Sequence, residues 1–150
     1  MGRLQEAEPL LRESLEIRRK ALGAEHPQVG LALSNMGSLL QDMGRLEEAE
    51  ALYRESLEIR RKALGAEHPD VGQSLNNMGM LLQDMGRLEE AEPLFREELE
   101  ICRKALGAEH PDVGASLCNL GGLLKDMGRR EEAEPLYREG LEILRSGPPG

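Results

Sequence analysis

The segment MGRLEEAEAL, residues 43–52, decides the fold because it returns along the chain at a fixed interval. Closely similar copies begin at Met1, Met85 and Met127, so that each copy starts 42 residues after the preceding one. A second motif, ALGAEHP, recurs with the same spacing and ends at Pro27, Pro69 and Pro111. Self-similarity at a period of about 20–50 residues is typical of proteins that stack one structural unit.

The period predicts one repeat domain, residues 1–150, with three whole units and part of a fourth. The units cover residues 1–42, 43–84, 85–126 and 127–145. We expect residues 146–150 to form a flexible tail, because SGPPG replaces the expected continuation. The apolar residues are mostly Leu, Ala, Met and Ile, and the chain has no Trp, one Phe and two Tyr. This composition favours helices over strands.

Each unit contains signals for two helices, which are clearest between Pro69 and Gly107. Pro69 suits the first turn of a helix, and the carboxylate of Asp70 complements the positive end of the helix dipole. Apolar residues then recur at steps of three and four until Gly86, which can end a helix in the left-handed conformation. A second helix is predicted from Leu88 to Leu106, with both leucines on its apolar face. We call the first helix of each pair helix A and the second helix B.

Neither helix can bury its apolar face alone, so successive pairs must stack. The sequence therefore predicts an all-α fold, an α–α superhelix of antiparallel helix pairs with seven helices. A glycine recurs in the middle of helix A, at Gly37, Gly79 and Gly121. Such a glycine costs about 0.5–1 kcal/mol relative to alanine in an exposed helix. We expect the facing helix B to approach too closely for a Cβ atom, although retention after recent duplication explains the same recurrence.

The order of residues in each pair resembles the tetratricopeptide repeat. The matching positions in one copy are Leu75, Met78, Gly79, Gly86, Ala91 and Phe95. The additional segment RKALGAEHPDV, residues 103–113, lengthens the family's unit of about 34 residues to 42 and is similar to repeats of kinesin light chain and of bacterial tetratricopeptide proteins. The resemblance implies a scaffold for protein–protein interaction, which binds extended peptide segments on a concave surface lined by helix A.

The charge and composition exclude other classes of partner. A net charge of -9 argues against nucleic acid, because contacts with phosphates require clustered Lys and Arg. No stretch approaches the roughly 20 apolar residues of a membrane span, and the N-terminus lacks the apolar core of a signal peptide. Cys102 and Cys118 have no counterpart cysteine in the other units, which favours free thiols whose role is open. We therefore expect a cytoplasmic protein.

The units differ from one another mainly on one stripe of helix A. The stripe consists of Gln73, Asn76, Met80 and Gln83, with Lys125 as the counterpart of Gln83 in the next unit. In the geometry that the resemblance implies, this stripe faces the concave surface, where a peptide-reading site would vary. A solvated face that is free to drift predicts the same pattern, and helix B also varies, at Glu98 and Cys102.

Invariant amides and acids accompany this stripe. The amides are Asn35, Asn77 and Asn119, and Asp84 belongs to a row of acids at the end of helix A. An Asn side chain can both donate to and accept from the backbone of an extended peptide, and related repeats place an Asn at this position against bound peptide. The alternative is that each amide bonds to a neighbouring repeat. The acids favour a basic or neutral segment, or are merely solvated.

Three histidines could suggest metal or acid–base chemistry, since His26, His68 and His110 each follow a Glu. They lie one repeat apart, and a helix spacing of about 8–10 Å is too long for one ion to bridge directly. We assign them to the loop that begins helix A. The sequence has no glycine-rich phosphate loop, nucleophile motif or spaced set of metal ligands. We expect no enzymatic activity, no cofactor and no metal site.

The chain opens on a helix B that has no helix A before it, which suggests truncation. Leu4, Ala7, Leu10, Leu11 and Leu15 would then form an uncovered apolar face. We expect self-association, or exchange of helices, through this end. The alternative to a peptide-binding scaffold is a structural spacer or sensor array within a larger signalling protein, with no ligand in the groove.

Overall fold

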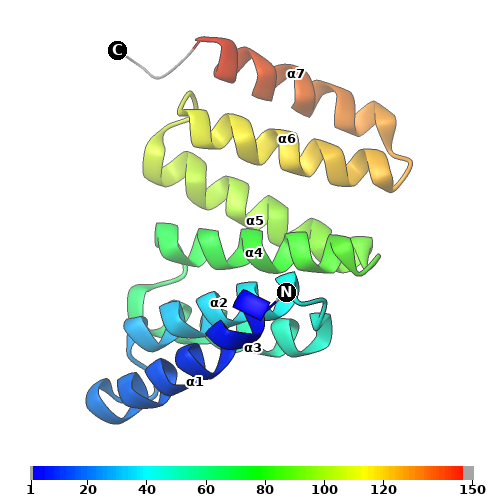
Figure 1. Cartoon of the computed structure of the whole chain (residues 1–150). Coiled ribbons are helices and arrows are strands. Elements are labelled where there is room, and N and C mark those ends of the chain that lie inside the picture. The colour runs from blue at the N-terminus through cyan, green and yellow to red at the C-terminus, as the bar shows by residue number, and fades with distance from the viewer. Residues whose placement is uncertain (1, 147–150) are drawn as a thin grey trace. The chain divides into compact units, whose positions relative to one another are not determined.

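The structure is a computed structural model that describes residues 2–146, and residues 147–150 of the predicted tail lie outside this range. Within it, the chain forms seven α-helices and no strand (Figure 1). The helices are α1 (Gly2–Leu22), α2 (Pro27–Asp42), α3 (Leu46–Leu64), α4 (Pro69–Asp84), α5 (Leu88–Leu106), α6 (Pro111–Asp126) and α7 (Arg130–Ser146). The predicted all-helical fold of paired helices is confirmed. Helices A are α2, α4 and α6, and helices B are α1, α3, α5 and α7.

Local signals place the ends of helix A where the sequence predicts them. In the second pair the backbone N–H of Asp70 donates to Nδ1 of His68 at 3.0 Å, and Pro69 follows this histidine as the first helical residue. His26 and His110 cap α2 and α6 in the same way. The assignment of the histidines to the start of helix A is therefore confirmed. Gly86 adopts a φ of 76°, which lets the chain leave α4 within a short turn.

The chain divides into two compact units, which we describe separately. Unit 1 covers residues 1–66 and contains α1, α2 and α3, and unit 2 covers residues 67–150 and contains α4 to α7. In unit 1, α2 packs against both α1 and α3. Leu15, Val29, Leu33 and Ile59 contribute to its core. The expectation that Leu15 belongs to an uncovered face is therefore wrong, because α2 covers it and leaves 6% of it exposed.

In unit 2, α5 packs against α4 and α6, and α6 packs against α7. The largest fully buried side chains of this unit are Leu75, Leu81, Leu82, Phe95, Leu117, Leu120, Leu123 and Leu124. Leu88 is half-buried, whereas Leu106 is 42% exposed and does not belong to the buried face. The reason is its position, since Leu106 is the last residue of α5 and lines a pocket between the helices.

The mid-helix glycines allow a close contact with helix B, as expected. A Cβ atom added at Gly79 would lie 3.0 Å from the ring of Phe95 on α5. At Gly37 the ring of Tyr53 would be 2.9 Å away. The packing explanation is confirmed, and the structure adds that an aromatic side chain of helix B, rather than its backbone, occupies the space of the missing Cβ.

Candidate functional site

Unit 2 contains a pocket of about 340 Å³ between α4, α5 and α6. Both helices A contribute carboxamide side chains to its walls, Gln73 and Asn76 from α4 and Asn119 from α6. Helix α5 contributes Glu98 and Cys102. Side chains of two successive repeats therefore line one cavity, which we call the α4–α6 pocket.

Two of the predicted amides meet across this pocket. The Nδ2 atom of Asn119 donates to Oδ1 of Asn76 at 3.3 Å. Asn119 thus bonds to the neighbouring repeat, as the alternative interpretation of the invariant amides predicted. Asn119 remains exposed and Asn76 half-exposed, so that both amides keep groups available to a ligand. Asn77, the invariant amide of α4, is half-buried and does not line the pocket.

The other predicted residues of α4 lie further along the helix. Nδ2 of Asn76 contacts the sulfur of Met80 at 3.6 Å, and Met80 is 47% exposed. Nε2 of Gln83 donates to Oδ2 of Asp126 on α6 at 2.9 Å. Asp84 is exposed at the end of α4. These residues extend the polar surface along α4 beyond the α4–α6 pocket.

Two predicted residues lie elsewhere. Lys125 lines a separate pocket of about 360 Å³ with Arg130 and Tyr137, at the junction of α6 and α7. Asn35 is exposed on α2 and belongs to unit 1. The predicted set is therefore not one constellation, since Gln73, Asn76 and Asn119 share a pocket and the others do not.

Glu98 is the most unusual residue of the α4–α6 pocket. Its Oε2 atom accepts from the hydroxyl of Ser116 on α6 at 2.8 Å, whereas its Oε1 atom is buried without a hydrogen-bond partner. Burial raises the pKa of Glu98 above its ordinary value. The negative charge of Asp112 also raises this pKa, whereas the hydrogen bond from Ser116 lowers it. Burial and the Glu98 carboxylate also raise the pKa of the Cys102 thiol. The uncharged thiol is favoured, which is the opposite of an activated nucleophile.

Glu98 and Cys102 were not among the predicted site residues. The variation of helix B at these positions supported the alternative of a solvated face that is free to drift. The structure shows that the variable positions of helix B, Glu98 and Cys102, line the same pocket as the variable positions of helix A, Gln73, Asn76 and Ala115. The signal was present in the sequence, but the packing of two helices A over one helix B was needed to combine it.

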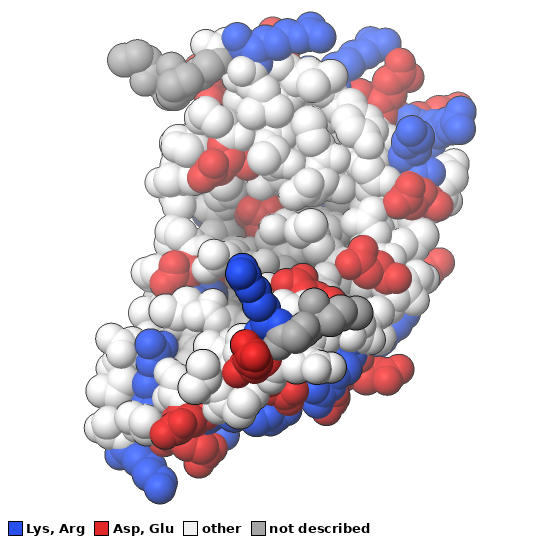
Figure 2. All heavy atoms as spheres, in the orientation of Figure 1, with Lys and Arg blue, Asp and Glu red and all other residues white. Residues whose placement is uncertain are grey.

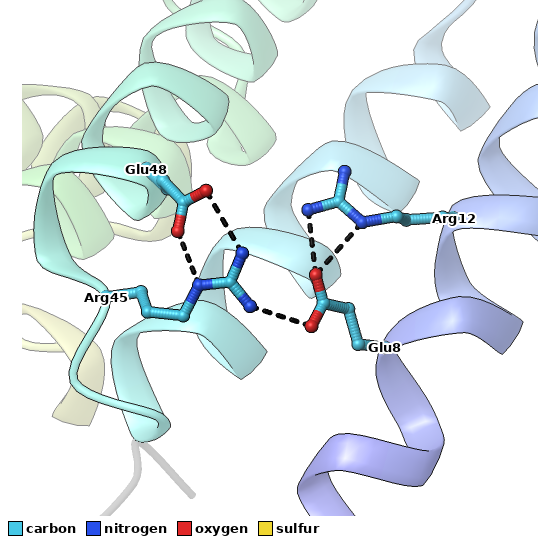
Figure 3. Close-up of polar contacts among 4 residues, drawn as sticks. All are labelled: Glu8, Arg12, Arg45 and Glu48. Carbon is cyan, nitrogen blue, oxygen red and sulfur yellow. Dashed lines mark hydrogen bonds and ion pairs between the residues drawn. The ribbon is translucent and has the colours of Figure 1, made fainter.

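Charged residues on the helix B side form a recurring network. In unit 1 the carboxylate of Glu8 binds both Arg12 of the same helix, at 2.8 Å, and Arg45, which precedes α3, at 2.7 Å (Figure 3). Arg45 also binds Glu48. In unit 2 the corresponding residues Glu92, Arg96, Arg129 and Glu132 make the same contacts. Within each unit, the arginine of an MGR motif thus connects one helix B to the next.

We expect Arg129→Ala to reduce the thermal stability of the chain measurably, by less than the core substitutions discussed below. The hydrogen bonds from Arg129 lower the pKa values of Glu92 and Glu132 below the ordinary 4.5. A lowered folded-state pKa stabilises the protein above the unfolded value, and this stabilisation is lost as the pH falls through the folded value. The difference between wild type and variant should therefore shrink as the pH falls below about 4.5 in thermal melts.

The matched control is Arg138→Ala. Arg138 binds Glu134 of the same helix at 2.9 Å and is 78% exposed, so its loss should change the melting temperature little. High salt should also reduce the effect of Arg129→Ala. An effect of Arg129→Ala that is independent of pH and salt would contradict the assignment to ion pairing.

Within residues 2–146, no group of three or more His, Cys, Asp or Glu side chains is placed to bind a metal ion. Among the helices described, none combines the length and apolar character that crossing a membrane requires.

Comparison with known proteins gives the family of the chain. The sequence pattern of the tetratricopeptide repeat matches residues 1–62, 28–97 and 70–146. A comparison with curated protein sequences finds no match. The crystal structure of BtubC (BKLC) from P. vanneervenii has a TM-score of 0.89 at 24% identity, which concerns the fold alone. The match covers 97% of this chain and 58% of BtubC, so the chain spans less than two thirds of that protein.

A second similar structure contains the nearly identical TPR-like repeats assigned to a kinesin light chain of Podosopora anserina. Its TM-score is 0.80 at 30% identity, and the match covers 97% of this chain and 69% of that one. A point variant of the same repeats has a TM-score of 0.81 at 30% identity, with 95% and 67% covered. The repeated pattern matches from one end of the described structure to the other, and the chain therefore belongs to the tetratricopeptide repeat family.

Proposed function

We propose that this chain is a protein-interaction scaffold that binds an extended peptide segment on helices α4 and α6 of unit 2. Repeats of this family generally mediate protein–protein interactions. The observation that carries the proposal is the convergence of positions that differ between repeats, Gln73, Asn76, Glu98, Cys102 and Ala115, on one pocket. If the variable positions had only drifted on a solvated surface, there would be no reason for those of two helices A and one helix B to line the same pocket.

The chemistry of the pocket supports an extended backbone as the ligand. The side chains of Gln73, Asn76 and Asn119 each carry a donor and an acceptor, which match the N–H and C=O groups of a peptide. The bond between Asn119 and Asn76 is 3.3 Å long and exposed, so a ligand can replace it with little loss. Asn77, Met80, Gln83 and Asp84 would continue the contact surface along α4. Asn35 of unit 1 and Lys125 of the pocket between α6 and α7 would contact peptide at places of their own.

A displayed library of random 12-residue peptides, selected on the full chain, tests this proposal. For every peptide selected, we expect the double variant Gln73→Ala/Asn119→Ala to weaken binding by about tenfold, which corresponds to the loss of two ordinary hydrogen bonds. The dissociation constants are measured by isothermal titration calorimetry. Glu100→Ala is the control, because Glu100 is exposed on α5 and does not line the pocket.

Unchanged affinity of all selected peptides for the double variant would exclude the α4–α6 pocket as the binding surface. If the library yields no specific peptide, the alternative of a spacer or sensor array without a groove ligand is favoured instead.

The net charge, the histidines and the thiols support inferences about the partner, the mode of action and the location of the chain. We infer a protein or peptide partner rather than nucleic acid, because the net charge is -9. We infer action by binding rather than catalysis, since the three histidines cap helices and the Cys102 thiol is disfavoured as a thiolate. A cytoplasmic location is consistent with two free cysteines, Cys102 and Cys118.

We further propose that a second copy of the chain associates through α1. Leu10 is 67% exposed and Ile17 is 58% exposed on this helix. The isoleucines at the position of Ile17 in the other helices B are buried, and each lies against a glycine of the paired helix A. They are Ile59, Ile101 and Ile143. The exposed face of α1 is therefore the kind of surface that helix A covers in the other pairs.

We expect the wild-type chain to dimerise in a concentration-dependent way in sedimentation velocity experiments. The double variant Leu10→Glu/Ile17→Glu should remain monomeric, because two carboxylates replace the apolar contact. Leu144→Glu is the control, since Leu144 is an exposed apolar residue on α7, 43% accessible, outside the proposed interface. A wild-type chain that stays monomeric at millimolar concentration would contradict self-association.

A further inference from the structure

We propose that the α4–α6 pocket receives an arginine or lysine side chain of the bound segment, with Glu98 as its anionic partner. This inference rests on the proposed function, because it names the side chain that the peptide-binding surface selects. It depends on four features of the described residues, namely the charge of the lining, its apolar part, an oxygen of Glu98 without a hydrogen-bond partner and a comparison with unit 1.

The lining of the pocket is acidic and contains no cationic residue. Glu98 and Asp112 contribute two carboxylates, and none of the lining residues is Lys or Arg. On the face that Figure 2 shows, the surface over α4 to α6 is mostly uncharged with scattered acidic side chains, and the basic side chains visible in unit 2 lie toward α7. A cation that enters the pocket therefore meets two carboxylates of the lining and no lining residue of the same charge.

The remaining lining suits the stem of a long cationic side chain. Ile101, Ala105, Leu106 and Ala115 present apolar surface beside the two carboxylates. Arginine and lysine bury their methylene groups against apolar surface and keep the charged group at a polar one. A pocket of about 340 Å³ that combines both surfaces matches this division.

One carboxylate oxygen of Glu98 lacks a partner. The side chain lies near Gly72 of α4, where an added Cβ would be 3.9 Å from Cγ of Glu98, and it receives one hydrogen bond, from Ser116 of α6. The Oε1 atom is buried without a partner, and such an acceptor is costly to leave unsatisfied. A guanidinium or ammonium group that reaches the carboxylate supplies the missing donor and the compensating charge.

Unit 1 has a buried cationic side chain at the equivalent position of helix B. The position of Cys102 is occupied there by Arg60, and the position of Glu98 by Ser56. Arg60 is only 3% exposed, and its Cγ would be 3.3 Å from a Cβ added at Gly30. In unit 2 the shorter Cys102 stands in place of this arginine and leaves space. Glu98 stands in place of the serine and adds a carboxylate. A cationic side chain from a partner would therefore occupy space that a long cationic side chain of the chain itself takes up in unit 1.

The test uses the full chain labelled with ¹⁵N and two capped heptapeptides, Ac-GSARASG-NH₂ and the same peptide with neutral citrulline in place of arginine. We expect the arginine peptide to shift the amide signals of residues 98–106 and 112–119 in a saturable way. It should bind about tenfold more tightly than the citrulline peptide, the lower range for a hydrogen bond to a charged group. A lysine peptide and its Nε-acetyl form provide the corresponding pair for an ammonium group.

Two variants assign the preference to Glu98. Glu98→Gln should reduce the difference between arginine and citrulline to about twofold or less, as expected when the charge is removed. Glu98→Ser introduces the residue of the first two repeats and should have the same effect. It provides a second test if Glu98→Gln does not fold. Glu100→Gln is the control and should retain the full preference, since Glu100 lies outside the pocket.

A third variant tests the comparison with unit 1. Cys102→Arg introduces the residue of the first two repeats beside Glu98, so the added side chain should occupy the pocket and abolish the saturable shifts. Retained binding of the arginine peptide by this variant would place the binding site elsewhere.

Equal affinities for arginine and citrulline, an unchanged preference in Glu98→Gln, or the absence of saturable shifts would each overturn the inference. These outcomes are separate from the library experiment. Peptides that depend on Gln73 and Asn119 but show no preference for a cation would leave the proposed function intact and remove Glu98 from it.

Discussion

Replacing Phe95 with alanine should lower the free energy of unfolding by about 3–5 kcal/mol, the cost typical of removing a buried phenylalanine. Phe95 is 1% exposed, and its ring fills the space where Gly79 lacks a Cβ. Its removal opens a cavity between α4 and α5 that neighbouring rigid helices can close only in part. Urea denaturation followed by circular dichroism at 222 nm measures the change.

Two further substitutions separate cavity formation from other effects. Phe95→Tyr should change stability little, because Tyr53 and Tyr137 occupy the same position in other repeats and Tyr53 donates to Gln41 at 3.0 Å. Gly79→Ala in the wild-type background should destabilise the chain through the 3.0 Å contact, but in the Phe95→Ala background it should stabilise it. If Gly79→Ala changes the stability equally in the two backgrounds, the ring of Phe95 and Gly79 are not in contact.

Gly140→Ser should lower the free energy of unfolding by about 1–3 kcal/mol, as for other overpacked sites. Serine occupies this position in the first two repeats, as Ser14 and Ser56, so a comparison of repeats alone would favour it. In unit 2, however, a Cβ at Gly140 would lie 2.8 Å from the backbone oxygen of Gly114 and 2.8 Å from the sulfur of Cys118. The backbone of α6 cannot move away as a flexible side chain can, so the crossing of α6 and α7 must open.

The control for this substitution is Gly122→Ala. A Cβ at Gly122 would lie 3.2 Å from the hydroxyl oxygen of Tyr137, which is the end of a side chain, and the gain in helix propensity is about 1 kcal/mol. Gly122→Ala should therefore be neutral or stabilising. Equal or higher stability of Gly140→Ser in the same urea titrations would show that the close crossing of α6 and α7 is not required.

The ends of the helices could be predicted because their signals are local. The second pair runs from Pro69 to Asp84 and from Leu88 to Leu106, where the proline, the glycines and the apolar periodicity place it. The burial of individual residues was harder to predict. Leu106 fits the apolar pattern of α5 but is exposed, and Leu15 was expected to be uncovered but is buried by α2. Burial depends on which helix lies opposite, which periodicity within one helix does not contain.

The candidate site was predictable in its helix A part only. Equivalent residues are 42 positions apart, yet neighbouring helices A bond at a separation of 43, from Asn119 to Asn76 and from Gln83 to Asp126. Because of this offset, the invariant Asn119 meets the variable Asn76 rather than its own counterpart Asn77. The contribution of Glu98 from helix B also depends on how the pairs stack. Both features are properties of the packed repeats and not of any single repeat.

The arginine that connects one helix B to the next has a consequence for the evolution of the gene. Arg45 and Glu8 are 37 residues apart, and so are Arg129 and Glu92. Recombination between near-identical copies removes or adds a whole period of coding sequence, and the new junction then receives the same arginine and the same glutamate at the same distance. An array of this kind can change its number of copies without a new interface having to be selected.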